Sequence, residues 1–166
     1  NIPGHYVNQV VGDASYDLTE FEYIGTVTTT TYVAAGSPSS GFSSLGHMQN
    51  ADEVIAAITN ISSTDGLGTV VAGEETGINL RTINHEGSSE AVLSAMRGDA
   101  DMVQFPVESL IAEIEAGELE PLWVYSDERI DELPDTPTIA ELGYEGLLDL
   151  VSLHRVLATT PDTPEE

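Results

Sequence analysis

Apolar and polar positions alternate most regularly between residues 78 and 125. The segment 78–84 alternates as a strand does, and the loop after it ends in Ser88 and Ser89, which commonly begin helices. Gly98 is placed to end that helix. One apolar helix face lies between them, made by Val92, Ala95 and Met96. The pattern predicts a strand, a loop and a short helix in that order.

A second strand and helix follow directly. Residues 100–105 resemble a strand, Pro106 is a favoured first residue of a helix, and Gly117 closes the helix. The apolar positions of this helix recur at i, i+3, i+4 and i+7, at Val107, Leu110, Ile111 and Ile114. Residues 121–125 then form another strand. Strands separated by helices of this length predict parallel pairing with right-handed crossovers, so the fold class is α/β with a mainly parallel sheet.

Upstream, residues 23–35 are long, apolar and rich in β-branched side chains, with four consecutive threonines, Thr28–Thr31, at the centre. They predict an extended strand. Asn50 followed by Glu53 is a variant of the capping box ahead of several apolar residues. We therefore expect a helix over residues 51–59.

The remaining segments are rich in Ser, Gly and Pro. Residues 35–48 predict a loop. Residues 137–143 predict a brief helix, and the apolar stretch 147–158 predicts a strand. The final Thr-Pro-Glu-Glu, residues 163–166, has the composition of a helix start.

The net charge of the chain excludes some classes of binding partner. Asp and Glu number 29 against 4 basic residues, all of them Arg, and the formal net charge is -25. Such a field repels nucleic acid and anionic membranes, so neither is an expected partner. Disorder is set aside because 40% of the residues are hydrophobic and fall in periodic runs. The scattered acids indicate a halophilic protein, since molar salt shortens the Debye length to about 3 Å and screens the repulsion.

Several chemistries have no support in the sequence. There is no cysteine for a disulfide or a thiolate, and no apolar run long enough to span a bilayer. The four His residues, at 5, 47, 85 and 154, have no carboxylate or His at metal-ligand spacing. No nucleophile and base occur together in a known motif, so we expect no catalysis, no cofactor and no metal. The chain opens at Asn1 without Met or a signal sequence, which suggests a mature product or a fragment.

Two loops carry candidate anion-binding groups. Gly66 and Gly68 lie in the segment Ser62–Thr69, where a tight turn at a helix start would point backbone N–H groups at an anion. Gly87 gives the same freedom to the loop His85–Ser89. Taken alone, the first loop also fits an ordinary turn and the second also fits plain capping. The second loop follows a predicted strand and the first follows a possible short strand, and open α/β sheets bind ligands where parallel strands end.

The order of short motifs resembles the solute-binding proteins of tripartite tricarboxylate transporters, the Bug family. The most specific motif is Leu133-Pro-Asp-Thr-Pro-Thr-Ile-Ala-Glu-Leu-Gly-Tyr144. The others, in chain order, are Tyr16-Asp17 with Phe21 and Ile24-Gly25, Gly66-Leu-Gly-Thr69, Thr76-Gly77, Glu86-Gly87, Arg97-Gly-Asp-Ala-Asp101, Ile114-Glu-Ala-Gly-Glu-Leu119 and Thr163-Pro-Glu165. Their collinear order covers nearly the whole chain.

The resemblance implies a type II periplasmic-binding-protein fold with ligand held between two domains. By segment, residues 1–26 would belong to domain 1, residues 27–123 would form domain 2, and residues 124–166 would return to domain 1. Part of the first domain, with its own ligand loop, would lie outside this chain. The implied function is capture of a small carboxylate outside the cytoplasm for the permease subunits of a membrane transporter. A ligand-sensing module of a signalling system with the same fold is the alternative.

The expected ligand contacts come from uncharged groups of domain 2, because none of the four Arg falls in the two loops. The expected ligand-binding residues are Thr64, Gly66, Gly68, Thr69, Gly87, Ser88, Ser89 and Gln104. Backbone N–H groups and hydroxyls form charge-assisted hydrogen bonds to a carboxylate. Glu86 stands where many relatives carry Lys, which leaves the charge preference of the site open.

Overall fold

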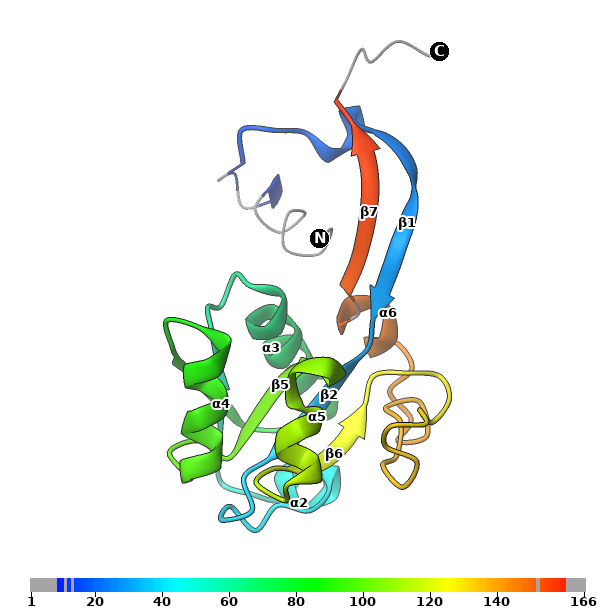
Figure 1. The fold of residues 1–166 in the computed structure, drawn as a ribbon. Helices are drawn as coiled ribbons and strands as arrows, with labels where there is room; N and C mark the ends of the chain where they lie inside the picture. The colour runs from blue at the N-terminus through cyan, green and yellow to red at the C-terminus, as the bar shows by residue number, and fades with distance from the viewer. Residues whose placement is uncertain (1–8, 11, 13, 152, 161–166) are drawn as a thin grey trace.

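The computed structural model describes residues 9–10, 12, 14–151 and 153–160 and comprises a compact body with a long two-stranded ribbon rising from it (Figure 1). The strands are β1 (Glu22–Thr30), β2 (Tyr32–Gly36), β3 (Val54–Ile58), β4 (Leu80–Asn84), β5 (Met102–Pro106), β6 (Glu120–Val124) and β7 (Leu153–Thr159). The helices are η1 (Leu18–Glu20), α2 (Leu45–Gln49), α3 (Thr64–Thr76), α4 (Ser88–Arg97), α5 (Val107–Glu115) and α6 (Leu147–Val151).

The body is built on a five-stranded sheet of order β4-β3-β5-β2-β6. Strand β3 pairs in parallel with β4 and β5, whereas β2 pairs antiparallel with β5 and β6. Four strands therefore run in one direction and β2 runs opposite. The α/β class is confirmed, and the sheet is mixed because β2 enters from the ribbon and lies between β5 and β6.

Helices cover both faces of this sheet and bury two apolar clusters. One face packs against α2, α3 and α6, and its largest buried side chains include Met48, Trp123 and Leu147. The other face packs against α4 and α5, with Leu110 and Val103 fully buried. Alternate residues of each strand supply the two clusters, as the two-residue period of a strand requires. The body is a three-layer α/β structure.

The ribbon pairs β1 with β7 in antiparallel register, from Glu22 opposite Thr159 to Thr30 opposite Leu153. Only Thr31 separates β1 from β2, so the predicted strand over 23–35 is confirmed with one interruption. The strand predicted within 147–158 is also present, as β7 after the short helix α6.

The predicted helix over 51–59 is wrong, because Val54–Ile58 is the strand β3. Asn50 ends helix α2 instead of beginning a helix. Strand β3 lies between β4 and β5 and is covered on both faces, so its residues are apolar without interruption. Such a run does not distinguish a buried strand from a buried helix by its period.

Two smaller expectations also need correction. Residues 139–143 form turns and no helix, with Gly143 at a positive φ of 90°. The predicted loop over 35–48 contains the start of α2, capped by the Ser44 side chain.

The helix start expected at residues 163–166 lies outside the described residues. The domain limits at residues 26 and 123 remain a prediction.

Candidate functional site

Three helices begin at the same edge of the sheet, the edge that faces the ribbon (Figure 1). Helix α3 follows β3, α4 follows β4 and α5 follows β5, and these strands run in the same direction. The carboxyl ends of parallel strands lie at one edge, which is where open α/β sheets bind ligands. The topology therefore brings both predicted loops to a common edge.

The start of α3 is held by a network of polar contacts. Both carboxylate oxygens of Asp65 accept hydrogen bonds from Thr59, one from its backbone N–H at 2.8 Å and one from its hydroxyl at 2.7 Å. The Ser63 hydroxyl caps the helix by accepting from the Gly66 N–H at 3.2 Å. A Cβ on Gly66 would lie 1.9 Å from the Asn60 carbonyl oxygen, so only glycine fits there. This corner is preorganised by side chains that sequence reasoning did not select.

The predicted turn at Gly66 and Gly68 is corrected by this geometry. Both glycines lie inside α3, and the helix begins at Thr64 after the cap residue Ser63. Thr64 is itself buried, with 8% of its surface exposed. The helix continues to Thr76. Glycine is used here for close packing and not for a turn.

Gln104 and Thr69 lie beneath this corner and are buried, each with 1% of its surface exposed. The Tyr125 hydroxyl donates to Gln104 Oε1 at 2.5 Å. Gln104 Nε2 points at the first turns of α3, where a Cβ on Gly68 would lie 2.9 Å from it. Among the described residues neither Gln104 Nε2 nor the Thr69 hydroxyl has a hydrogen-bond partner. Sequence reasoning placed these groups on the site surface, and the structure places them below it.

The start of α4 is open by comparison. Gly87 is the cap residue in an extended conformation, and no side chain caps the helix. Ser88 and Ser89 occupy the first turn with exposed side chains, and they line a hollow of about 380 Å³ together with Ser109 and Glu113 of α5 and apolar residues of α4. These predicted hydroxyls are available to a ligand, although α3 and α4 pack on opposite faces of the sheet.

Acidic groups surround the same edge. Asp65, Glu90 and Glu108 each lie in the first turn of one of the three helices, where they suit the helix dipole and oppose an anionic ligand. The pKa of Tyr32 is raised to about 12, mainly by burial and also by the charges of Asp65 and Glu108, while the charge of Arg155 acts in the opposite direction. The edge is therefore an acidic environment in which a carboxylate depends on directed hydrogen bonds.

The described part of the chain supplies no metal site and no membrane span. Among these residues no three His, Asp or Glu side chains are close enough together to hold a metal ion. No described helix has both the length and the apolar character needed to cross a bilayer.

Comparison with known proteins places the chain in a defined family. The family model described as the tripartite tricarboxylate transporter family receptor matches residues 3–166. Protein BugT of Bordetella pertussis, strain Tohama I, is 33% identical over 94 residues, which is 55% of this chain and 28% of that protein.

Solved structures of low sequence identity share the fold. MatC from Rhodopseudomonas palustris with bound malate is 15% identical with a TM-score of 0.75, covering 90% of this chain and 52% of that chain. A second R. palustris protein, solved with adipate, is 22% identical with a TM-score of 0.73, covering 90% and 51%. The chain thus spans about half the length of these structures and 28% of the curated relative.

Proposed function

We propose that this chain, which belongs to the tripartite tricarboxylate transporter receptor family, is part of an extracytoplasmic receptor that captures a small organic di- or tricarboxylate. The receptor then delivers the ligand to the permease subunits of a membrane transporter, without catalysis. The similar structures with malate and adipate support a dicarboxylate as the first ligand to test.

The observation that carries the proposed site is the uncapped start of α4 beside the carboxyl end of β4. The first-turn N–H groups of α4 have no side-chain cap, and the hydroxyls of Ser88 and Ser89 are exposed next to them. Unpaired amides at a helix start attract anions through both hydrogen bonds and the helix dipole. Gly87 keeps the approach free of a side chain.

The start of α3 supports the site from below. Gln104 and Thr69 are buried beneath its first turns, and Gly68 permits the close approach of Gln104. We therefore assign Ser88 and Ser89 direct ligand contacts, with Thr64, Gly66, Gly68, Thr69 and Gln104 as positioning residues.

Calorimetry of the full-length receptor in molar salt, with malate, adipate and citrate as probes, tests the proposal. Ser88→Ala and Ser89→Ala should each weaken malate binding roughly threefold to tenfold, the loss expected for one hydrogen bond to a charged group. Ser43→Ala is the matched control, because Ser43 is also exposed but precedes α2 at the opposite end of the body (Figure 1).

Thr69→Val separates positioning from stability. It removes a buried hydroxyl that has no described partner while keeping the shape of the side chain, so the free energy of unfolding should be nearly unchanged. A fall in malate affinity would then report the loss of this hydroxyl from the proposed site. Unaltered affinity in Ser88→Ala, Ser89→Ala and Thr69→Val together would refute the site.

A further inference from the structure

A second hollow lies at the base of the ribbon and is lined by none of the predicted ligand residues. Its volume is about 460 Å³, which suits a small molecule. The ribbon contributes Thr28–Thr31 and Arg155, and the body contributes Glu108 from α5 and Glu132 from the loop after β6. It therefore brings together strands and loops that are far apart in the sequence.

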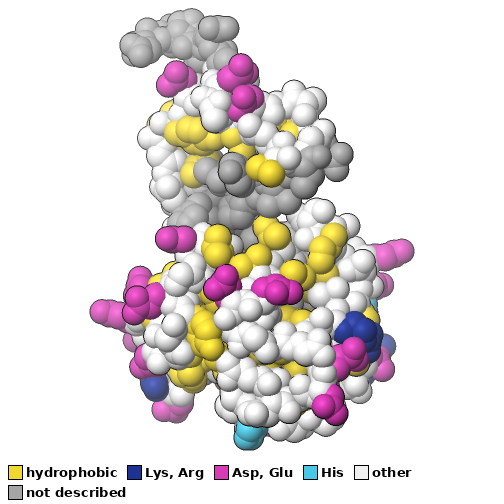
Figure 2. Space-filling model, turned by 180° about the vertical axis from the view of Figure 1, so that it is seen from behind, with side chains coloured by type: hydrophobic (Ala, Val, Ile, Leu, Met, Phe, Trp, Pro, Cys, Tyr) yellow, Lys and Arg dark blue, Asp and Glu magenta, His cyan; other side chains and the backbone are white. Residues whose placement is uncertain are grey.

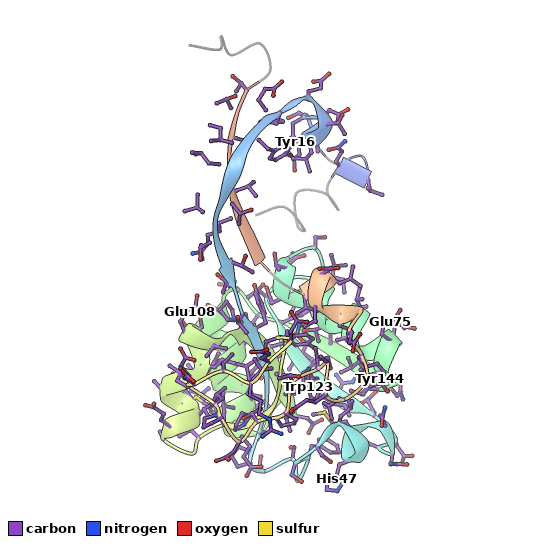
Figure 3. All side chains as sticks on the ribbon, turned by 90° about the vertical axis from the view of Figure 1, so that its right-hand side faces the viewer. Tyr16, His47, Glu75, Glu108, Trp123 and Tyr144 are labelled. Atoms are coloured by element: carbon purple, nitrogen blue, oxygen red, sulfur yellow. The ribbon has the colours of Figure 1, made fainter. Side chains whose placement is uncertain are left out.

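The hollow lies away from the corner of α3. Figure 3 shows Glu108 on the outer, convex side of the ribbon, whereas Glu75 of α3 and Tyr144 lie on the other side of the body. The helix beside the hollow, α5, packs on the sheet face opposite α3. The hollow at the start of α4, where Ser88 and Ser89 lie, also borders α5, but the two hollows share no lining residue.

The charges of the hollow are of both signs and are not paired with each other. Arg81 forms an ion pair with Glu53 and Arg129 forms one with Glu141, each at 3.0 Å. Arg155 forms no ion pair within the part of the chain that the structure describes. One guanidinium thus lines the same hollow as two carboxylates and forms an ion pair with neither.

Hydroxyl and aliphatic groups complete the lining. Four consecutive threonines place hydroxyls and backbone groups along the ribbon side, while Val107, Ile111 and Ile130 line the body side. Small-molecule sites typically combine an apolar wall with a few polar groups that orient the ligand. The combination here has a donor for a carboxylate, acceptors for an ammonium group and an aliphatic surface.

We propose that this hollow is a second small-molecule site, for a zwitterionic solute with an aliphatic side chain, such as an aliphatic amino acid. The carboxylate pairs with Arg155 and accepts from threonine hydroxyls. The ammonium group donates to Glu108 and Glu132, and the side chain packs on Ile111 and Ile130. A simple carboxylate leaves the two acids unpaired and a simple amine meets Arg155, so the zwitterion is preferred over both.

Calorimetry of the full-length receptor in molar salt tests the proposal, with three probes that are similar in shape and differ in charge. Leucine carries both charges, isocaproate lacks the ammonium group and isoamylamine lacks the carboxylate. We expect leucine to bind at least about tenfold more tightly than either analogue, because each analogue loses a charge-assisted contact. Arg155→Gln and Glu132→Gln should each weaken leucine binding by a similar factor, and Arg97→Gln, at the far end of α4, should not change it.

Saturating malate distinguishes this site from the proposed carboxylate site. Leucine should bind equally well in its presence, and Ser88→Ala should leave leucine binding unchanged. Any one of four results would overturn the second site. Leucine and malate could compete, leucine and isocaproate could bind equally well, Arg155→Gln could bind leucine with unchanged affinity, or leucine at about 10 mM could fail to bind. Circular dichroism of each variant excludes misfolding, and loss of malate binding alone would refute only the carboxylate site.

Discussion

Strands β1 and β2 are neighbours in the sequence and differ completely in their surroundings. All five residues of β2 are buried, whereas the first eight of the nine residues of β1 are exposed. Strand β2 lies between two strands and two helical layers, while β1 pairs only with β7. A β-branched composition is therefore enough to make a segment extended, but it does not determine whether that segment is buried.

The consequence of this difference is energetic. A two-stranded ribbon in water is marginally stable, because neither face removes enough apolar surface from solvent. Tyr23, Ile24, Val27 and Leu157 are between 47% and 71% exposed on the ribbon. The body has two buried clusters and the described ribbon has none, so the body should dominate the stability of the described chain.

The largest effect that separates the two regions should come from removing salt. Acidic side chains are spread around the body, with few basic ones among them (Figure 2). In dilute buffer their repulsion is unscreened over a Debye length of about 30 Å at 0.01 M, so we expect loss of structure, first in the ribbon and then in the body. Hydrogen exchange across a salt series would show β1 amides exchanging before β2 amides.

Circular dichroism gives the simpler check on that expectation. A spectrum that stays the same after dialysis from molar salt into dilute buffer would contradict salt-dependent folding. Equal protection of β1 and β2 amides from hydrogen exchange at every salt concentration would contradict the expected difference in stability between the ribbon and the body.

Overpacking the corner of α3 should have the next largest effect. Gly66→Ala places a Cβ 1.9 Å from the Asn60 carbonyl oxygen, so the loop has to move, and we expect a loss of about 3 kcal/mol in the free energy of unfolding. Gly46→Ala is the matched control, since nothing lies within 4 Å of its Cβ position in α2. Urea unfolding in molar salt measures both, and equal stability of the two variants would be inconsistent with the close contact.

The smallest expected effect comes from matched valine substitutions in β2 and β1, which test the difference in burial between the two strands directly. Val33→Ala in β2 removes two fully buried methyl groups and should cost about 2 kcal/mol in the free energy of unfolding. Val27→Ala in β1 makes the same change where the side chain is 71% exposed and should cost less than about 0.5 kcal/mol. Similar losses in the two variants would mean that the ribbon is covered in solution.

Sequence patterns identified the elements whose periodicity is unambiguous. Helices α4 and α5 were predicted from an apolar face, a start signal and a terminating glycine, and Gly98 does end α4 in the left-handed conformation. Strand β3 was missed because its two covered faces make it apolar throughout. The Gly-x-Gly pattern at Gly66 and Gly68 predicts a turn at a helix start, and only the close contacts of these glycines explain why both lie inside α3.

The candidate site was predicted in part. The exposed hydroxyls of Ser88 and Ser89 lie at a helix start, as expected. Gln104 and Thr69 are buried, and Asp65 and Ser63, which hold the corner, are not among the predicted ligand-binding residues. Arg155 gave no local signal either, since its hollow is formed by four separate segments.

By itself the sequence determined the α/β class, helices α4 and α5, the acidic surface and the family, because each follows from local periodicity, from composition or from the order of short motifs. Only the tertiary structure decided which side chains are buried beneath α3, that β2 lies reversed between β5 and β6, and that Arg155 shares a hollow with Glu108 and Glu132. The physical reason is that burial and proximity depend on the packing of segments distant in sequence, and no local pattern encodes their distances.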